Sequence, residues 1–177
     1  MDKKVAVLSA EPQPCARSKS HADLRAAFDV FFEAYAARDA ERVAPFLHDD
    51  VVWTVSGPIE VLPFCGVHRG KADVLALIGR KVPAVLRVFS CVAEAIVVDG
   101  DQVAMLTRLS ARRPADGRVI SYRVANFFRF VEGKIIENLS LLDSFDAVEQ
   151  VVGHPLTQPT LAEDGSLVPA ISDLVSL

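Results

Sequence analysis

A carboxylate, a phenol and a carboxamide near the end of the chain have the types and spacing for chemistry: Asp143, Tyr122 and Asn126. Tyr122 and Asn126 lie four residues apart in a segment with strand character, so their side chains should share one face. A carboxylate in apolar surroundings has its charged form disfavoured, which makes it a stronger general base. Asp143 could therefore remove a proton from carbon beside a carbonyl, while Tyr122 donates to the developing oxyanion.

Two long strands joined by a tight turn must position these groups. The stretch 119–143 alternates apolar and polar residues on either side of Glu132-Gly133. A two-residue turn pairs Val131 with Lys134. Counting back from that pair predicts that Asp143 lies opposite Tyr122. A single β-bulge would shift this register.

Each of the three residues also has a purely structural interpretation. Asp143 precedes a predicted helix and could be its N-cap. Tyr122 could be a core aromatic residue whose hydroxyl finds one partner. Asn126 lies among apolar neighbours and needs partners if it is buried, either a ligand or backbone and water. The sequence leaves these alternatives open.

Further candidates border the predicted site. Trp53 lies on the first strand and forms a pocket wall or core packing. His68, in a long loop at 56–69, edges a pocket mouth or lies on the surface. Arg108 faces the pocket only if the turn at 114–117 has the right length, because a four-residue turn would point it outward.

Two acids and two thiols complete the set. Glu137 is a second pocket acid or a residue of the open rim, and rim is the favoured interpretation. Glu94 is the only strand residue that we consider as a second acid near Asp143. Cys65 and Cys91 are interpreted as small core residues, because no histidine partner is indicated for either thiol.

Composition excludes several classes of protein. The 177 residues suggest one domain, half of them hydrophobic, with a net charge of -4. That charge argues against nucleic-acid binding, and no apolar run is long enough to span a membrane. The three cysteines and four histidines show no metal-ligand spacing, so we expect no metal and a reducing, cytoplasmic location.

The order of elements predicts an α+β protein. An apolar stripe (Leu24, Phe28, Phe31, Phe32 and Tyr35) predicts a helix from His21. Two further helices are expected at 40–47 and 71–81, and strands dominate from 86 onward. We therefore expect a flexible tail at 1–20, a domain at 21–152 and an extension at 153–177. Helices closing a curved antiparallel sheet would enclose a mainly apolar pocket.

Motifs along this domain resemble the SnoaL-like polyketide cyclases of the nuclear-transport-factor-2-like superfamily, related to ketosteroid isomerase and limonene-epoxide hydrolase. The matching stretches are D-D-V-V-W-T-V at 49–55, L-P-F-C-G-V-H-R-G at 62–70, N-F-F-R-F-V-E-G-K-I-I-E at 126–137 and L-L-D at 141–143. The resemblance implies a cone-shaped barrel with three N-terminal helices around a deep pocket, and a dimer. It also implies that Asp143 acts as a general base.

Departures from the family pattern limit the reaction. The epoxide hydrolase carries an Arg and a second Asp two residues apart, where this chain has Arg108 and Ser110. Many relatives have a histidine where this chain has Asn126. The leading hypothesis is cofactor-free cyclase or isomerase chemistry on an apolar carbonyl compound, with Asp143 as base and Tyr122 and Asn126 as donors. The alternatives are a non-catalytic ligand-binding or dimeric accessory protein and an epoxide-hydrolase-like enzyme.

Overall fold

The computed structural model describes residues 21–156, 160–161 and 167–168. The tail expected at 1–20 lies outside this range, and the extension expected at 153–177 is described only in part. Within the described residues, no helix is both long and apolar enough to cross a membrane.

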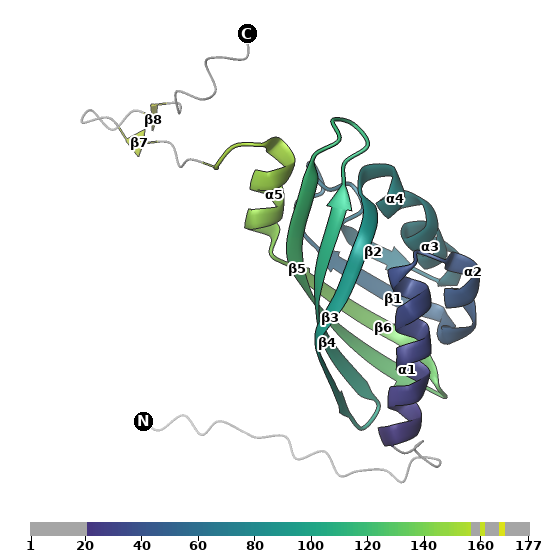
Figure 1. Cartoon of the computed structure of the whole chain (residues 1–177). Coiled ribbons are helices and arrows are strands. Elements are labelled where there is room, and N and C mark those ends of the chain that lie inside the picture. The colour runs from purple at the N-terminus through teal and green to yellow at the C-terminus, as the bar shows by residue number, and fades with distance from the viewer. Residues whose placement is uncertain (1–20, 157–159, 162–166, 169–177) are drawn as a thin grey trace, which may run out of the picture.

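Six strands form one curved sheet that does not close into a barrel (Figure 1). Its order is β2-β1-β6-β5-β4-β3, with bounds β1 Leu47–Ser56, β2 Gly66–Arg69, β3 Arg87–Asp99, β4 Gln102–Arg112, β5 Val119–Val131 and β6 Lys134–Leu142. The α+β class is confirmed. All neighbouring strands are antiparallel except β1 and β6, which run parallel, so a single pair departs from the predicted curved antiparallel sheet.

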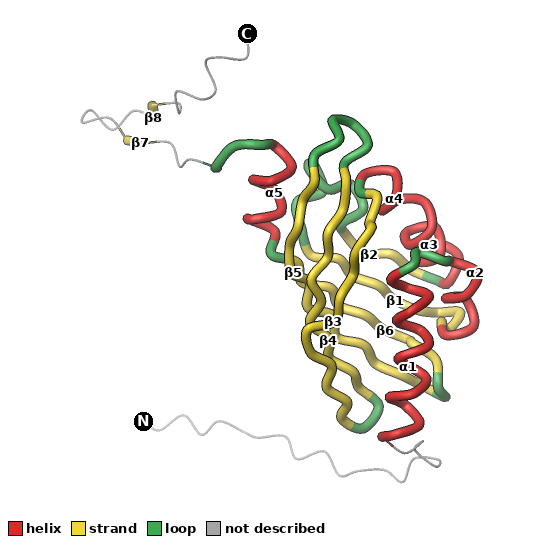
Figure 2. Tube along the Cα trace, in the orientation of Figure 1, coloured by secondary structure: helices red, strands yellow, loops and turns green. Residues whose placement is uncertain are grey.

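Helices α1 to α4 cover the concave side of the sheet, and α5 lies apart from them beside β5 (Figures 1 and 2). Their bounds are α1 His21–Ala36, α2 Ala40–Val43 with a 3-10 turn at Ala44–Phe46, α3 Lys71–Ala76, a π-helical turn at Leu77–Lys81, α4 Val82–Val85 and α5 Ser144–Val152. The segment predicted as a long loop at 56–69 ends in β2, which pairs with β1. A separate pair, β7 Thr160–Leu161 and β8 Leu167–Val168, follows.

The core is centred on aromatic rings between α1 and the sheet. Phe28 and Phe31 come from the predicted apolar stripe, and both are fully buried. They meet Phe128 of β5 at ring-centroid distances of 5.1 and 5.6 Å, and Trp53 of β1 lies 5.8 Å from Phe128. Rings of this size dominate the free energy gained from burial, so this cluster fixes α1 against the sheet.

A β-bulge in β6 changes the predicted register. The turn at Glu132-Gly133 has positive φ at both residues, 52° and 78°, as a two-residue hairpin turn requires. Val131 pairs with Lys134 as predicted, but the ladder shifts by one residue after Ile135. The prediction that Asp143 lies opposite Tyr122 was therefore wrong, since every β6 residue beyond the bulge points to the other face.

Candidate functional site

A cavity lies between the concave face of the sheet and a wall formed by α1, the π-helical turn at Leu77–Lys81 and α4. Its volume is about 40 Å³, and about 460 Å³ when the open space at its mouth is included. The residues lining it are mostly aliphatic and aromatic, which is usual for small-molecule sites: Tyr35, Arg38, Trp53, Val55, Phe64, Leu77, Ile78, Val82, Leu109, Tyr122, Val124, Ser140 and Leu142.

A π-helical turn builds the helical wall of this cavity. The amide of Val82 donates to the carbonyl oxygen of Leu77, five residues earlier. This spacing stacks Leu77 and Val82 on one face, with Ile78 beside them, and all three line the cavity. Pro83 does not end the helix, as it continues to Val85. Single π-helical turns are frequent at functional sites because they re-aim side chains.

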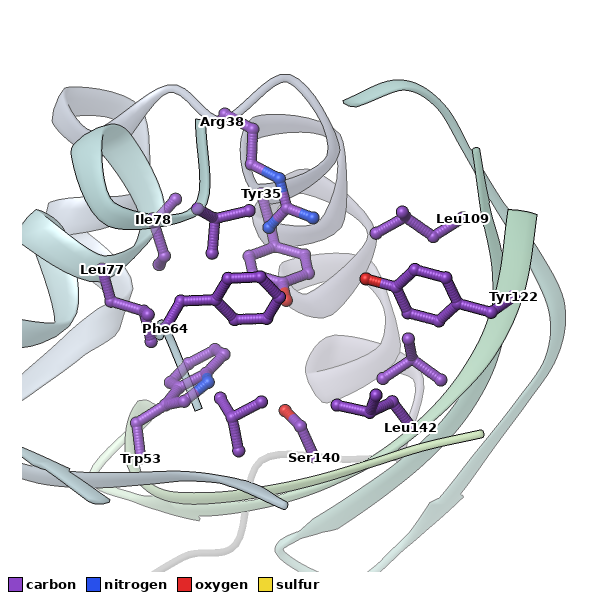
Figure 3. Close-up of a pocket in the computed structure, with 13 residues that line it drawn as sticks. Tyr35, Arg38, Trp53, Phe64, Leu77, Ile78, Leu109, Tyr122, Ser140 and Leu142 are labelled. Atoms are coloured by element: carbon purple, nitrogen blue, oxygen red, sulfur yellow. The ribbon is translucent and has the colours of Figure 1, made fainter. Parts of the chain in front are cut away.

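Polar groups point toward the middle of the cavity from three directions (Figure 3). The guanidinium of Arg38 enters from the end of α1, the hydroxyl of Tyr122 from β5 and the hydroxyl of Ser140 from β6. None of the lining residues is a carboxylate or a histidine. The cavity therefore offers hydrogen-bond donors and one positive charge, and it lacks an ordinary side-chain base.

Arg38 is held against the ring of Tyr35, with Cζ 4.6 Å from the ring centroid. Its Nε is buried and has no hydrogen-bond partner among the described residues. Burial by itself lowers the pKa of the guanidinium, but the nearby oxygens of Tyr35 and Tyr122 and the Cys91 thiol outweigh it, so the net pKa is raised. Arg38 is therefore a fixed positive charge at the cavity.

Tyr122 presents a neutral phenol to the cavity. The residue is 4% exposed, and burial raises the pKa of its hydroxyl above the ordinary value. Its hydroxyl points into the cavity, and neutral phenols are good hydrogen-bond donors (Figure 3). A buried donor of this kind needs an acceptor, which water or a ligand in the cavity can supply.

Ser140 connects the cavity floor to two buried amides. Asn138 Nδ2 donates to Ser140 Oγ at 2.8 Å, and Ser140 Oγ donates to Asn126 Oδ1 at 2.7 Å. Asn126 and Asn138 are each 1% exposed, and Asn138 Oδ1 has no partner among the described residues. The Ser140 hydroxyl therefore accepts a hydrogen bond from Asn138 and donates its own proton to Asn126.

Asp143 does not reach this cavity. Its amide donates to the carbonyl oxygen of Arg123 at 3.1 Å, so it continues the register that the bulge sets. Its side chain is exposed and caps α5, accepting from the amide of Asp146 at 3.4 Å. Of the two interpretations that the sequence left open, the geometry matches the helix cap.

Trp53 lines the cavity, and Asn126 does not. Trp53 is 1% exposed and forms part of the cavity wall. Asn126 faces the same side of the sheet and reaches the cavity only through Ser140. Its partner is thus a side chain of the protein, and contact of either residue with a ligand stays a prediction.

Arg108 and the two glutamates lie on the outer face of the sheet. Glu94 accepts from Arg108 Nε at 2.9 Å and from Arg123 Nε at 2.8 Å, which lowers the pKa of its carboxyl. The turn after β4 joins Arg113 to Arg118, the four-residue case in which Arg108 points outward. Arg108 therefore does not line the cavity. Glu137 pairs with Arg129 on the same outer face, at 3.1 Å.

His68 is buried, but outside the cavity wall. Its Nε2 donates to the carbonyl oxygen of Phe64 at 3.0 Å, and its Nδ1 lies 3.2 Å from Asp73 Oδ2. Lys81 donates to the same carboxylate at 2.6 Å, and this bond lowers the pKa of Asp73. The cluster ties β2 to the helices above it, so the placement of His68 at the pocket mouth was wrong.

Sequence reasoning missed Arg38, Tyr35 and Ser140. Arg38 follows Tyr35 by three residues at the end of the predicted helix, so its spacing to the apolar stripe was visible. Ser140 could not be found, because only the bulge turns it inward. In the described residues, no three His, Cys, Asp or Glu side chains gather in a way that could hold a metal ion.

Comparison with known proteins defines the class. The SnoaL-like domain model matches residues 28–138, so the chain belongs to the family of SnoaL-like domains. No curated protein matches the chain.

Solved structures agree on the fold. A proposed isomerase from Rhodopseudomonas palustris has 28% identity and a TM-score of 0.64, with 78% of this chain and all of that chain covered. An LEH-like epoxide hydrolase from M. tuberculosis has 18% identity and a TM-score of 0.60, covering 75% of this chain and 91% of that chain. A protein with a ketosteroid isomerase-like fold from Catenulispora acidiphila, in complex with trimethylamine, has 12% identity and a TM-score of 0.60, covering 75% and 97%.

Proposed function

We propose that the cavity binds a small, largely apolar molecule through one of its oxygen atoms, and that the Tyr122 phenol donates a hydrogen bond to that oxygen. The observation that carries the proposal is the hydroxyl of Tyr122, a residue only 4% exposed, which points into the cavity (Figure 3). Aliphatic and aromatic walls supply affinity, and the single phenol supplies orientation.

Binding of neutral ring compounds tests this proposal. Acetophenone, cyclohexanone and benzamide should bind, and Tyr122→Phe should weaken binding about two- to tenfold, because a neutral hydrogen bond contributes about 0.5–1.5 kcal/mol. Titration calorimetry and ligand-detected NMR give the affinities. Ser121→Ala is the matched control, since it removes a hydroxyl from the neighbouring residue, which bonds Ser110 outside the cavity. Equal affinity of the wild type and Tyr122→Phe would contradict the assigned role of the phenol.

Cyclase- or isomerase-type catalysis is a second candidate. The similarity to the proposed isomerase from R. palustris favours it. Arg38 and Tyr122 could stabilise an enolate oxygen, but no carboxylate or imidazole lines the cavity to take the proton. The base would then have to be water or a group on the ligand. Hydrogen–deuterium exchange beside the carbonyl of bound acetophenone, followed by NMR, separates catalysis from binding alone.

The epoxide-hydrolase alternative lacks support in the geometry. Epoxide hydrolysis would require a second acid near Asp143, and Glu94 is the only strand residue that the sequence suggests for this role. Glu94 instead lies on the outer face between Arg108 and Arg123. We do not propose this activity.

Homodimer formation is proposed through the outer face of β5 and β6. Phe127 and Leu139 pair there across the two strands, 49% and 37% exposed, and Leu141 is 43% exposed. Neighbouring apolar side chains of this kind mark interaction surfaces. A cytoplasmic location is also proposed, in keeping with free thiols at Cys65 and Cys91.

A further inference from the structure

Arg38 occupies a backbone position that normally belongs to glycine. Its amide donates to the carbonyl oxygen of Tyr35, and the amide of Asp39 donates to that of Ala34. This pair of bonds is the Schellman motif, a common end of α-helices. In this motif the residue that follows the helix C-cap adopts a left-handed conformation. Arg38 does so with φ of 58°. A residue with a side chain pays a conformational cost there that glycine would avoid.

The guanidinium gains no ion pair in return. The two nearby carboxylates have other partners. Asp39 Oδ1 accepts a hydrogen bond from the backbone amide of Arg42 at 3.0 Å, and Glu33 Oε2 lies 4.0 Å from Arg42 Nη2. No ion pair to Arg38 is found among the described residues. The titratable groups that interact with it are the phenols of Tyr35 and Tyr122 and the Cys91 thiol, and none of the three is a carboxylate.

Arg38 is half-buried as a residue and its Nε is fully buried, and proteins usually pair a charge that is withdrawn from water in this way. Here the guanidinium lines the cavity, points into it, and carries a buried Nε with an unused hydrogen (Figure 3). The edge formed by Nε and one terminal nitrogen matches the two oxygens of a carboxylate. The protein therefore presents a two-donor cationic edge at the polar side of an otherwise apolar cavity.

We propose that the molecule bound in the cavity is a small ring compound carrying one carboxylate, and that Arg38 pairs with this carboxylate while the apolar walls hold the ring. The proposal rests on the proposed binding function and adds the charge of the ligand to it. Tyr122 donates to one carboxylate oxygen in this arrangement. The single cation favours a monoanion, since a second negative charge would find no partner among the lining residues.

Matched acids and amides test the charge separately from binding. Benzoate with benzamide, and cyclohexanecarboxylate with cyclohexanecarboxamide, keep ring and size while changing the charge. At pH 7 the wild type should bind each acid at least tenfold more tightly than its amide. Arg38→Met, which keeps the length of the side chain, should abolish that preference without reducing amide affinity. Arg38→Lys should restore part of the preference, because it returns the charge but not the two-donor edge.

Four outcomes overturn the proposal in distinguishable ways. Equal binding of acid and amide by the wild type refutes the anionic ligand and leaves the binding function intact. A preference for acids that persists in Arg38→Met refutes the role of Arg38. Loss of amide affinity in Arg38→Met, with an unchanged melting temperature, shows that Arg38 serves the ring and not the charge. Absence of binding by every acid and every amide refutes both the ligand class and the proposed function.

Discussion

Replacing Ser140 by alanine should destabilise the protein more than a lost hydroxyl normally does. The hydroxyl makes two hydrogen bonds, of 2.8 Å from Asn138 and 2.7 Å to Asn126, and both amides are 1% exposed. Ser140→Ala therefore leaves a donor of one amide and an acceptor of the other unpaired. Each orphaned buried group costs about 1–3 kcal/mol. Water entering from the cavity can satisfy part of this, so we expect about 2–3 kcal/mol in total.

Urea denaturation measures this cost as a lower midpoint with an unchanged m-value. The corresponding fall in melting temperature is about 4–12 °C, from about 2–4 °C per kcal/mol for a chain of this size. Ser121→Ala is again the control, because it disturbs a single half-buried bond of 3.0 Å to Ser110. It should cost less than about 1 kcal/mol.

An all-apolar replacement distinguishes orphaned groups from lost packing. The triple variant Asn126→Leu, Asn138→Leu and Ser140→Ala removes every member of the network and keeps similar volumes. It should recover most of the stability lost in Ser140→Ala, since replacing all partners together leaves no unpaired group. A cost below about 1 kcal/mol for Ser140→Ala, or a triple variant less stable than the single one, would refute the reasoning.

Two further predictions concern Asp143 and the outer face. Asp143→Ala should lower stability by about 1 kcal/mol through loss of the helix cap, Asp143→Asn should be nearly neutral, and neither should change ligand affinity in the calorimetric assay; loss of binding or turnover in Asp143→Asn would return this residue to the site. Wild-type protein should be a dimer by light scattering after size-exclusion chromatography, and Phe127→Glu should be a monomer with retained ligand binding; a wild-type monomer at all concentrations would dismiss the interface.

Local signals predicted most of the fold. The apolar stripe of α1 and the hairpin at 119–143 are set by neighbours a few residues apart, and their positions agree with the sequence prediction. The bulge after Ile135 could not be predicted, because it depends on how β6 packs between β1 and β5. This one extra residue determines which side chains of β6 face the cavity. It removed Asp143 from the predicted face and brought in Ser140.

The role of Arg38 was missed for a different reason. Sequence patterns identify buried positions by their apolar character, and an arginine at a helix end is usually solvated. The burial of its Nε is a tertiary effect, because Arg38 lines a cavity that residues of the sheet and of other helices enclose. The three-dimensional structure is needed to see that its guanidinium lies over the ring of Tyr35 and that, among the described residues, no carboxylate forms an ion pair with it.

The end of β6 inverts the usual burial pattern, and the inversion connects the two proposed surfaces. Asn138 and Ser140 are buried at 1% and 3% exposure, while Leu139 and Leu141 are exposed at 37% and 43%. An unbulged register would point the leucines inward and the polar residues outward, which the hydrophobic effect alone would favour. Conflicts between local pattern and fold concentrate at functional sites. A ligand bound at the polar floor of the cavity would offset the cost of burying the polar residues. A second copy of the chain packed on the outer face would offset the cost of exposing the leucines.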